Sequence, residues 1–240
     1  DFANRDTPFF LAVGFFRPHT PFVAPKKYFD IYDREKIEIP EIPSEYLATL
    51  PEPAVKSIRA KKDQLNLEKE LAQEIKEAYY ATISFVDAQV GRILDQLEAS
   101  GLDKNTVVVF TSDHGYHLGE HGHWQKNTLF ENATRIPLII SAPNSENKGE
   151  TSMSPVELID LYPTLMDLTN INTPQHVVGK SLEPLMKNVN ASVRGSALTR
   201  WRKGYSIKTK RYRLTKWGSN GELGYELYDH KNDKNELINL

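Results

Sequence analysis

Cysteine is absent from the 240 residues, which excludes disulfide bonds, thiolate metal sites and a cysteine nucleophile within them. Long apolar runs are missing too, and none approaches the roughly 20 residues that a membrane-spanning helix needs. We therefore expect no membrane span. The first residues show no charged-then-apolar segment of the kind that directs secretion. The net charge is only −2, so overall charge favours no class of partner, and we expect no nucleic-acid binding.

An initiating methionine is also absent, and the sequence DFANRDTPFFLAVGF reaches an apolar segment at Phe9. We therefore expect the chain to be part of a longer protein. Its content of 39% hydrophobic and 26% charged residues is that of a globular protein. The length allows one large α/β domain, or a domain with a small appendage.

Hydrophobic periodicity predicts most of the regular structure. Apolar residues at spacings of three, four and seven predict a helix from about Asn66 to Ser100, with Gly101 as its C-terminal cap. Short apolar or β-branched runs predict strands, and Ser154-Pro155 resembles a helix N-cap followed by proline, with Pro163 as a kink. The predicted strands are FFLAVGF at 9–15, TVVVFTS at 106–112 and IPLIIS at 136–141. Residues 25–65 are rich in Pro, Lys and Glu and predict irregular loops with short helical pieces.

This order of strands and helices predicts an α/β fold, as part of a doubly wound α/β/α sandwich. After about residue 190 the sequence changes to short alternating segments, SALTRW, GYSIKTKRYRLTKW and ELYD, which predict a small antiparallel sheet. We accordingly expect a catalytic-type α/β domain over residues 1–185 and a small antiparallel subdomain over residues 186–240.

The stretch TSDHGYHLGEHGHWQK, Thr111 to Lys126, is dense in ligand-type side chains. Asp113 and His114 stand where the second strand ends, and His19 follows the first strand. In open α/β sheets, ligands bind at the carboxyl ends of the strands, so these side chains are candidates for one site.

The residue types suggest a metal and an anion. Asp113 offers a hard oxygen ligand or a general base, His114 offers a nitrogen ligand, and Gly115 permits a sharp turn. Lys126 brings a positive charge suited to an anionic substrate. A loop hydrogen bond between Asp113 and His114 is the structural alternative.

The other polar and aromatic residues of the stretch have weaker functional interpretations. A zinc cluster of His114, His117, His121 and His123 is a further alternative, although loop histidines more often have structural roles. Glu120 more readily holds the loop through hydrogen bonds than acts as a base. Tyr116 and Trp124 either shape a pocket wall or pack.

These motifs carry a family resemblance. TSDHGYHLGEHGHWQK, with FFLAVGFFRPHTPF upstream and ELYDHKNDKNELINL at the end, resembles the C-terminal part of a sulfatase of the alkaline phosphatase superfamily, in its iduronate-2-sulfatase-like branch. The resemblance implies an alkaline-phosphatase-like fold and hydrolysis of a sulfate ester on a sulfated saccharide. It implies that Asp113 and His114 bind Ca²⁺, and that Lys126 and His19 contact sulfate, with His19 assisting the leaving group. Tyr116 matches an aromatic position that faces the substrate.

The resemblance also shows what these residues do not contain. The family nucleophile is a formylglycine made from Cys or Ser in C/S-x-P-x-R, and no such pattern occurs here; SAPNS at Ser141 lacks the arginine. The paired aspartates that complete the calcium site are missing as well. We expect both on a missing N-terminal half of the same protein, so that this chain alone is inactive, and we expect export by family analogy.

Two other functions remain open. The first is a zinc-dependent phosphatase or phosphodiesterase of the same superfamily. The second is a non-catalytic fragment that binds polyanions through a basic block with no acid from Arg194 to Lys216. A solvated sheet face is the alternative interpretation of that block.

Overall fold

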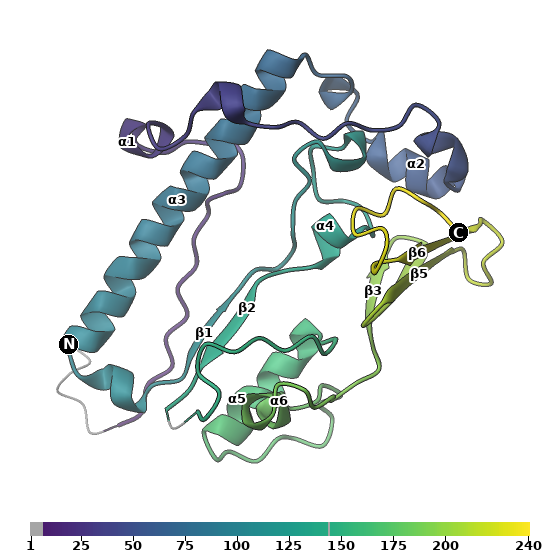
Figure 1. Cartoon of the computed structure of the whole chain (residues 1–240). Helices are drawn as coiled ribbons and strands as arrows, with labels where there is room; N and C mark the ends of the chain where they lie inside the picture. The colour runs from purple at the N-terminus through teal and green to yellow at the C-terminus, as the bar shows by residue number, and fades with distance from the viewer. Residues whose placement is uncertain (1–6, 144) are drawn as a thin grey trace. The chain divides into compact units, whose positions relative to one another are not determined.

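A computed structural model describes residues 7–143 and 145–240, which form two compact units (Figure 1). The first unit comprises the residues up to Pro40 together with Asn66–Thr106, and the second comprises Glu41–Leu65 together with Val107–Leu240. Within the described residues, no helix combines the length and the apolar character that crossing a bilayer requires.

The first unit is built on one long helix, α3 (Lys69–Ala99), as the periodicity predicts. The helix ends at Gly101, whose φ of 69° is left-handed and whose N–H donates to the carbonyl of Glu98 at 2.8 Å. Glycine adopts this conformation without the steric cost of a Cβ, and the predicted cap is confirmed. The unit also contains α1 and two 3₁₀ turns, at Lys26–Phe29, Arg34–Lys36 and Leu102–Asn105.

Residues 9–15, predicted as a buried strand, form no strand in the described structure, and this prediction is wrong. Phe10 is 85% exposed and Val13 is 49% exposed. A strand requires hydrogen bonds to a neighbouring strand, and the sheets of the described residues include none with this segment. The apolar composition was therefore insufficient to form a strand by itself.

The second unit contains a two-stranded antiparallel pair, β1 (Val108–Thr111) and β2 (Leu138–Ser141), in which Val109 lies opposite Ile140. Both predicted strands are thus confirmed. The α-helices of this unit are α2 (Glu52–Ile58), α4 (Glu131–Thr134), α5 (Leu161–Leu168) and α6 (Glu183–Lys187). The 3₁₀ turns are Tyr46–Thr49, Lys62–Gln64, Glu120–Gly122 and Leu158–Asp160. The short helices within residues 25–65 agree with the prediction for that segment.

The start of α5 differs from its prediction. Ser154-Pro155 does not begin a helix; a 3₁₀ turn begins at Leu158 and continues into α5. The two residues form a capping box. The Glu157 side chain accepts a hydrogen bond from the backbone N–H of Asp160, and the Asp160 side chain accepts one from the backbone N–H of Glu157. Pro163 then falls in the first turn of α5, where proline is tolerated. The predicted kink at this residue stays a prediction.

The C-terminal sheet is an antiparallel meander in the order β3-β4-β5-β6, as predicted (Figure 1). Its strands are β3 (Ser196–Trp201), β4 (Gly204–Thr209), β5 (Tyr212–Trp217) and β6 (Tyr225–Asp229). The predicted domain boundary between residues 185 and 186 stays a prediction.

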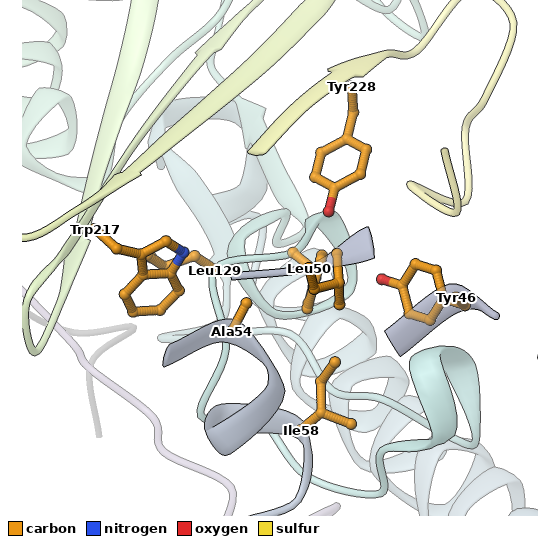
Figure 2. Close-up of a cluster of buried hydrophobic side chains, with 8 residues drawn as sticks. Tyr46, Leu50, Ala54, Ile58, Leu129, Trp217 and Tyr228 are labelled. Atoms are coloured by element: carbon orange, nitrogen blue, oxygen red, sulfur yellow. The ribbon is translucent and has the colours of Figure 1, made fainter. Parts of the chain in front are cut away.

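The core of the second unit joins residues that are distant in the sequence (Figure 2). Tyr46, Ala54 and Ile58 pack with Trp217 and Tyr228 of the C-terminal sheet. The remaining members of this cluster are Leu50, Leu129 and Phe130. Leu129 and Phe130 lie three and four residues after Lys126, the last residue of the histidine-rich stretch, so this core holds the chain close to the end of that stretch.

Candidate functional site

Asp113 and His114 lie immediately after β1, with side chains that are 84% and 36% exposed. The His114 Nδ1–H donates to the carbonyl of Gly115 at 2.8 Å, which leaves Nε2 with a free lone pair. Nε2 lies 3.6 Å from Asp113 Oδ2. Two ligand atoms at this separation fit a single shared cation.

The backbone around this pair is ordered by local hydrogen bonds. Ser112 Oγ donates to the carbonyl of His114 at 2.9 Å, and the N–H of His114 donates to Asp113 Oδ1 at 3.1 Å. Asp113 Oδ2 therefore remains available. The predicted loop hydrogen bond thus coexists with a geometry suited to metal binding.

Gly115 is required by packing rather than by a turn. A Cβ at this position would lie 2.0 Å from the carbonyl oxygen of Asn132 and 3.0 Å from that of Arg135. The Gly115 N–H donates to the carbonyl of Ala133 at 2.8 Å. The loop that carries Asp113 and His114 is therefore pressed directly against α4.

Lys126 ends a hairpin-like turn in which the N–H of His117 donates to the carbonyl of Gln125 at 2.8 Å. Lys126 is half-buried, and its ammonium forms no ion pair with any carboxylate of the described residues. A half-buried cation without a counter-ion suits an anionic ligand. The Tyr116 hydroxyl, in contrast, donates to the carbonyl of Trp124 at 2.8 Å and braces the turn.

His117, His121 and His123 form a buried cluster, with 0%, 1% and 2% exposure. His117 lies in edge-on contact with the other two rings, at centroid distances of 5.4 and 5.1 Å. His121 stacks on Phe130 at 3.9 Å. Burial lowers the pKa of all three rings, to about 4 for His121, so they are neutral at pH 7.

Each of these rings is anchored through one nitrogen. His121 Nδ1 lies 2.5 Å from the Tyr46 hydroxyl, and His123 Nδ1 donates to the carbonyl of Ile58 at 2.8 Å. His117 Nε2 lies 2.8 Å from Thr128 Oγ1. Their other nitrogens are buried and have no hydrogen-bond partner within residues 7–143 and 145–240.

The alternative of a four-histidine zinc cluster is not supported by the described residues. Across the part of the chain that the structure describes, the one group of three or more such residues whose ligand atoms lie close enough to share an ion is Glu131, His230 and Glu236. Arg213 already pairs with both of these glutamates. His114 lies beside Asp113, and the other three histidines hold the loop through buried hydrogen-bond contacts. Glu120 accepts the N–H of Leu118 at 2.6 Å, and buried Trp124 packs, as their structural interpretations predict.

The Arg213 ion-pair network was missed at the level of sequence. Arg213 is 2% exposed, and Glu236, from the tail ELYDHKNDKNELINL, is fully buried beside it. His230 Nε2 lies 2.6 Å from the same Glu236 carboxylate. The tail contains four acids, Glu226, Asp229, Asp233 and Glu236, and nothing in the sequence distinguishes Glu236 as the one that pairs with Arg213.

His19 belongs to the first unit and is exposed. Its Nδ1 lies 2.8 Å from the carbonyl of Thr20, so that Nε2 faces no described partner. The convergence of His19 with the loop of the second unit stays a prediction.

Comparison with known proteins identifies the family. A sulfatase profile matches residues 1–171, and a profile described as N-sulphoglucosamine sulphohydrolase, C-terminal, matches residues 119–240. A sulfatase of Formosa agariphila is 37% identical over 98% of this chain, and human iduronate 2-sulfatase is 35% identical over 70%. The chain belongs to the sulfatase family.

A solved structure supports the same fold. Phosphonate monoester hydrolase from Silicibacter pomeroyi superimposes with a TM-score of 0.82 and 26% identity, over 93% of this chain and 50% of that one. The chain therefore has the alkaline-phosphatase-like α/β fold, with the small antiparallel sheet at its C-terminal end. It spans 46% of the Formosa protein and 37% of the human one, about half or less of these relatives.

Proposed function

We propose that the chain forms part of a calcium-dependent sulfuric ester hydrolase that acts on a sulfated saccharide. The observation that carries the proposal is the pair of His114 Nε2 and Asp113 Oδ2, 3.6 Å apart in the same loop as the unpaired Lys126. A cation site and an unpaired ammonium in one loop together suit a sulfate group, whose oxygens carry the negative charge.

The proposed roles follow from these positions. Asp113 supplies a carboxylate oxygen of the type that Ca²⁺ prefers, and His114 supplies one nitrogen. Ca²⁺ takes six to eight ligands, so the remaining ligands come from elsewhere. When bound, the ion stabilises negative charge on the sulfuryl oxygens.

The other side chains bind and orient the substrate. Lys126 donates to a sulfate oxygen. His19, whose Nδ1–H donates to the Thr20 carbonyl, donates a proton from Nε2 to the leaving oxygen when its ring carries both protons. Tyr116 contributes its ring face, because its hydroxyl is engaged by Trp124. The formylglycine nucleophile has no counterpart in the 240 residues, so we propose that this chain alone is inactive and that the whole protein is exported, as its family generally is.

Phosphoester or phosphonate ester hydrolysis is the second candidate. The similarity to a phosphonate monoester hydrolase favours it. The absence of a four-histidine cluster among the described residues removes one route to a zinc site. Metal analysis of the complete protein separates the two candidates: calcium favours sulfate esters and zinc favours phosphorus esters.

The coding DNA immediately upstream of Asp1 provides the first test. An in-frame C/S-x-P-x-R motif with paired aspartates supports a sulfatase, whereas a Ser or Thr nucleophile among zinc-type ligands supports a phosphoesterase. A start codon directly before Asp1 would contradict catalysis by the formylglycine route.

Turnover of an aryl sulfate by the complete protein provides the second test. We expect Lys126→Ala to lower kcat by on the order of 10²-fold or more, because one preorganised contact to developing charge is lost. Lys61→Ala, an exposed lysine without an ion pair in the described residues, is the matched control and should change kcat less than about twofold. Equal activity of the Lys126 variant and wild type would remove Lys126 from the site.

A further inference from the structure

Seven of the nine cations in the basic block from Arg194 to Lys216 fall into two groups in the structure. Three of its arginines are structural: Arg194 pairs with Glu157 and Asp160, Arg211 with Asp229, and Arg213 with Glu131 and Glu236. These cations are neutralised within the chain and leave no charge for a ligand.

A second group remains without counter-ions. Arg200, Arg202, Lys203 and Lys216 form no ion pair with any carboxylate in the described parts of the chain. The register of the sheet brings them together, because Tyr205 of β4 lies opposite Arg200 of β3 on one side and Lys216 of β5 on the other. Arg202 and Lys203 form the turn between β3 and β4.

Aromatic rings separate these cations. The Arg200 guanidinium lies 5.2 Å from the ring centroid of Tyr205, and Lys216 Nζ lies 5.6 Å from the same centroid. Arg202 lies 4.7 Å from the ring of Trp201. Cation–π contacts at exposed sites contribute only about 0.5–1 kcal/mol each, so they orient the cations without replacing an anion.

Three of these cations, Arg200, Arg202 and Lys203, line a shallow pocket of about 160 Å³, termed here the basic pocket. Its lining consists of Arg200, Arg202, Lys203, Tyr205, Ser219 and Glu222. Glu222 is the one acid against three cations, and its carboxylate accepts the N–H of Asn220 at 2.9 Å. Backbone hydrogen bonds, chiefly those at Glu222 and Asn220, lower the pKa of Glu222, so this carboxylate serves its own turn.

We propose that the basic pocket binds a sulfate group of a polysaccharide, in addition to the loop Thr111–Lys126, none of whose residues lines it. Guanidinium groups donate paired hydrogen bonds to planar or tetrahedral oxyanions. Tyr205 offers an apolar ring face to the C–H side of a sugar. The inference relies on the proposed function for the identity of the polymer.

Charge distribution favours a polysaccharide over a nucleic acid. The whole chain carries a net charge of −2, and the four cations of this group gather at one end of one sheet. Nucleic-acid binding instead relies on an extended basic surface along many phosphates. A local pocket is suited to one anionic group at a time.

Binding of heparin to the 240-residue chain, measured by calorimetry at two salt concentrations, tests the proposal without any turnover. We expect Arg200→Ala combined with Lys203→Ala to weaken binding at least tenfold and to reduce the salt dependence. The matched control is Lys61→Ala with Lys62→Ala, two exposed lysines of the same unit, which should change affinity less than twofold. Tyr205→Phe should retain binding, and Tyr205→Ala should weaken it.

Several outcomes would overturn the proposal. Equal losses in the two double variants would indicate non-specific charge attraction, and equal affinity for duplex DNA would indicate a general polyanion surface. Tight binding of unsulfated dextran would exclude sulfate recognition. Thermal melting of each variant shows whether it folds. If Arg200→Ala unfolds, Arg200→Lys, which keeps the charge, replaces it in the binding measurement.

The test is independent of the catalytic proposal. Loss of heparin binding in the double variant, with Lys126→Ala still active on aryl sulfate, would support the basic pocket and contradict the catalytic role of Lys126. Intact heparin binding in the double variant, with Lys126→Ala inactive, would do the reverse.

Discussion

Glu226 is a buried carboxylate whose hydrogen-bond partners are neutral donors. It is 2% exposed, and it accepts the Trp217 Nε1–H at 2.5 Å and the Tyr228 hydroxyl at 2.8 Å. Burial raises its pKa from 4.5 to about 7. The folded state therefore binds a proton that the unfolded state releases between these two pH values.

We predict that this group makes the protein less stable as pH rises. Its contribution is complete below pH 4.5 and is lost as pH passes about 7. One pKa unit corresponds to about 1.4 kcal/mol, so the loss is roughly 3 kcal/mol. Urea unfolding between pH 4.5 and 8 should show a flatter profile for Glu226→Gln than for wild type. Exposed Glu150→Gln is the control, and an unchanged profile for Glu226→Gln would contradict the prediction.

The buried histidines have the opposite effect on stability. Burial lowers their pKa from 6.5, to about 4 for His121, so the unfolded state binds more protons in this interval. Stability is therefore complete above pH 6.5 and is lost as pH falls toward 4. His123→Leu should lose less stability than wild type between pH 7 and pH 5, measured by urea unfolding. Exposed His176→Leu should follow wild type, and a steeper loss in His123→Leu would refute this role.

Among the elements, the turn between β1 and α4 depends on a close backbone contact at Gly115. We predict that Gly115→Ala destabilises the chain by about 2 kcal/mol, because its Cβ would lie 2.0 Å from the Asn132 carbonyl oxygen. Gly91→Ala in α3 is the matched control, since no atom lies within 4 Å of the added Cβ. It should stabilise the protein by about 0.5–1 kcal/mol. Urea unfolding measures both, and equal effects would exclude the steric explanation.

The predictability of the elements depended on how local their causes are. The helix Lys69–Ala99 and its cap at Gly101 were predictable because periodicity and left-handed glycine are properties of the segment itself. Residues 9–15 have the same apolar character as β1, but a strand also needs a partner that sequence composition does not reveal. The start of α5 depends on the capping box of Glu157 and Asp160. The sequence predicted the helix start at Ser154-Pro155 instead, because serine followed by proline is the commoner N-cap pattern.

The candidate site was predictable only in part for the same reason. Asp113 and His114 were identified because they follow a strand. The distance of 3.6 Å between Asp113 Oδ2 and His114 Nε2 agrees with binding of one cation by both residues. The anchoring of His121 and His123 by Tyr46 and Ile58 was not predictable, because these contacts cross long stretches of sequence.

At the scale of the whole molecule, the exposed apolar segment 10–16 is a candidate site of self-association. Phe10 is 85% exposed and Phe16 is 67% exposed, and exposed apolar segments favour self-association. We predict that the 240-residue chain associates in a concentration-dependent manner, as measured by light scattering during gel filtration. Phe10→Glu with Phe16→Glu should reduce this association more than Val178→Glu, a single residue that is 80% exposed. Equal reduction by both would assign the effect to charge alone.

The anchoring of the histidine cluster has a consequence for how such loops are inherited. His121 contacts the Tyr46 hydroxyl, and His123 donates to the carbonyl of Ile58. The segment Glu41–Leu65 therefore holds the loop Thr111–Lys126 in position. A loop taken from another sulfatase would lack these contacts with the segment Glu41–Leu65. Positions 46 and 121 should therefore change together across the family, and successful loop exchange should require both segments to be exchanged at once.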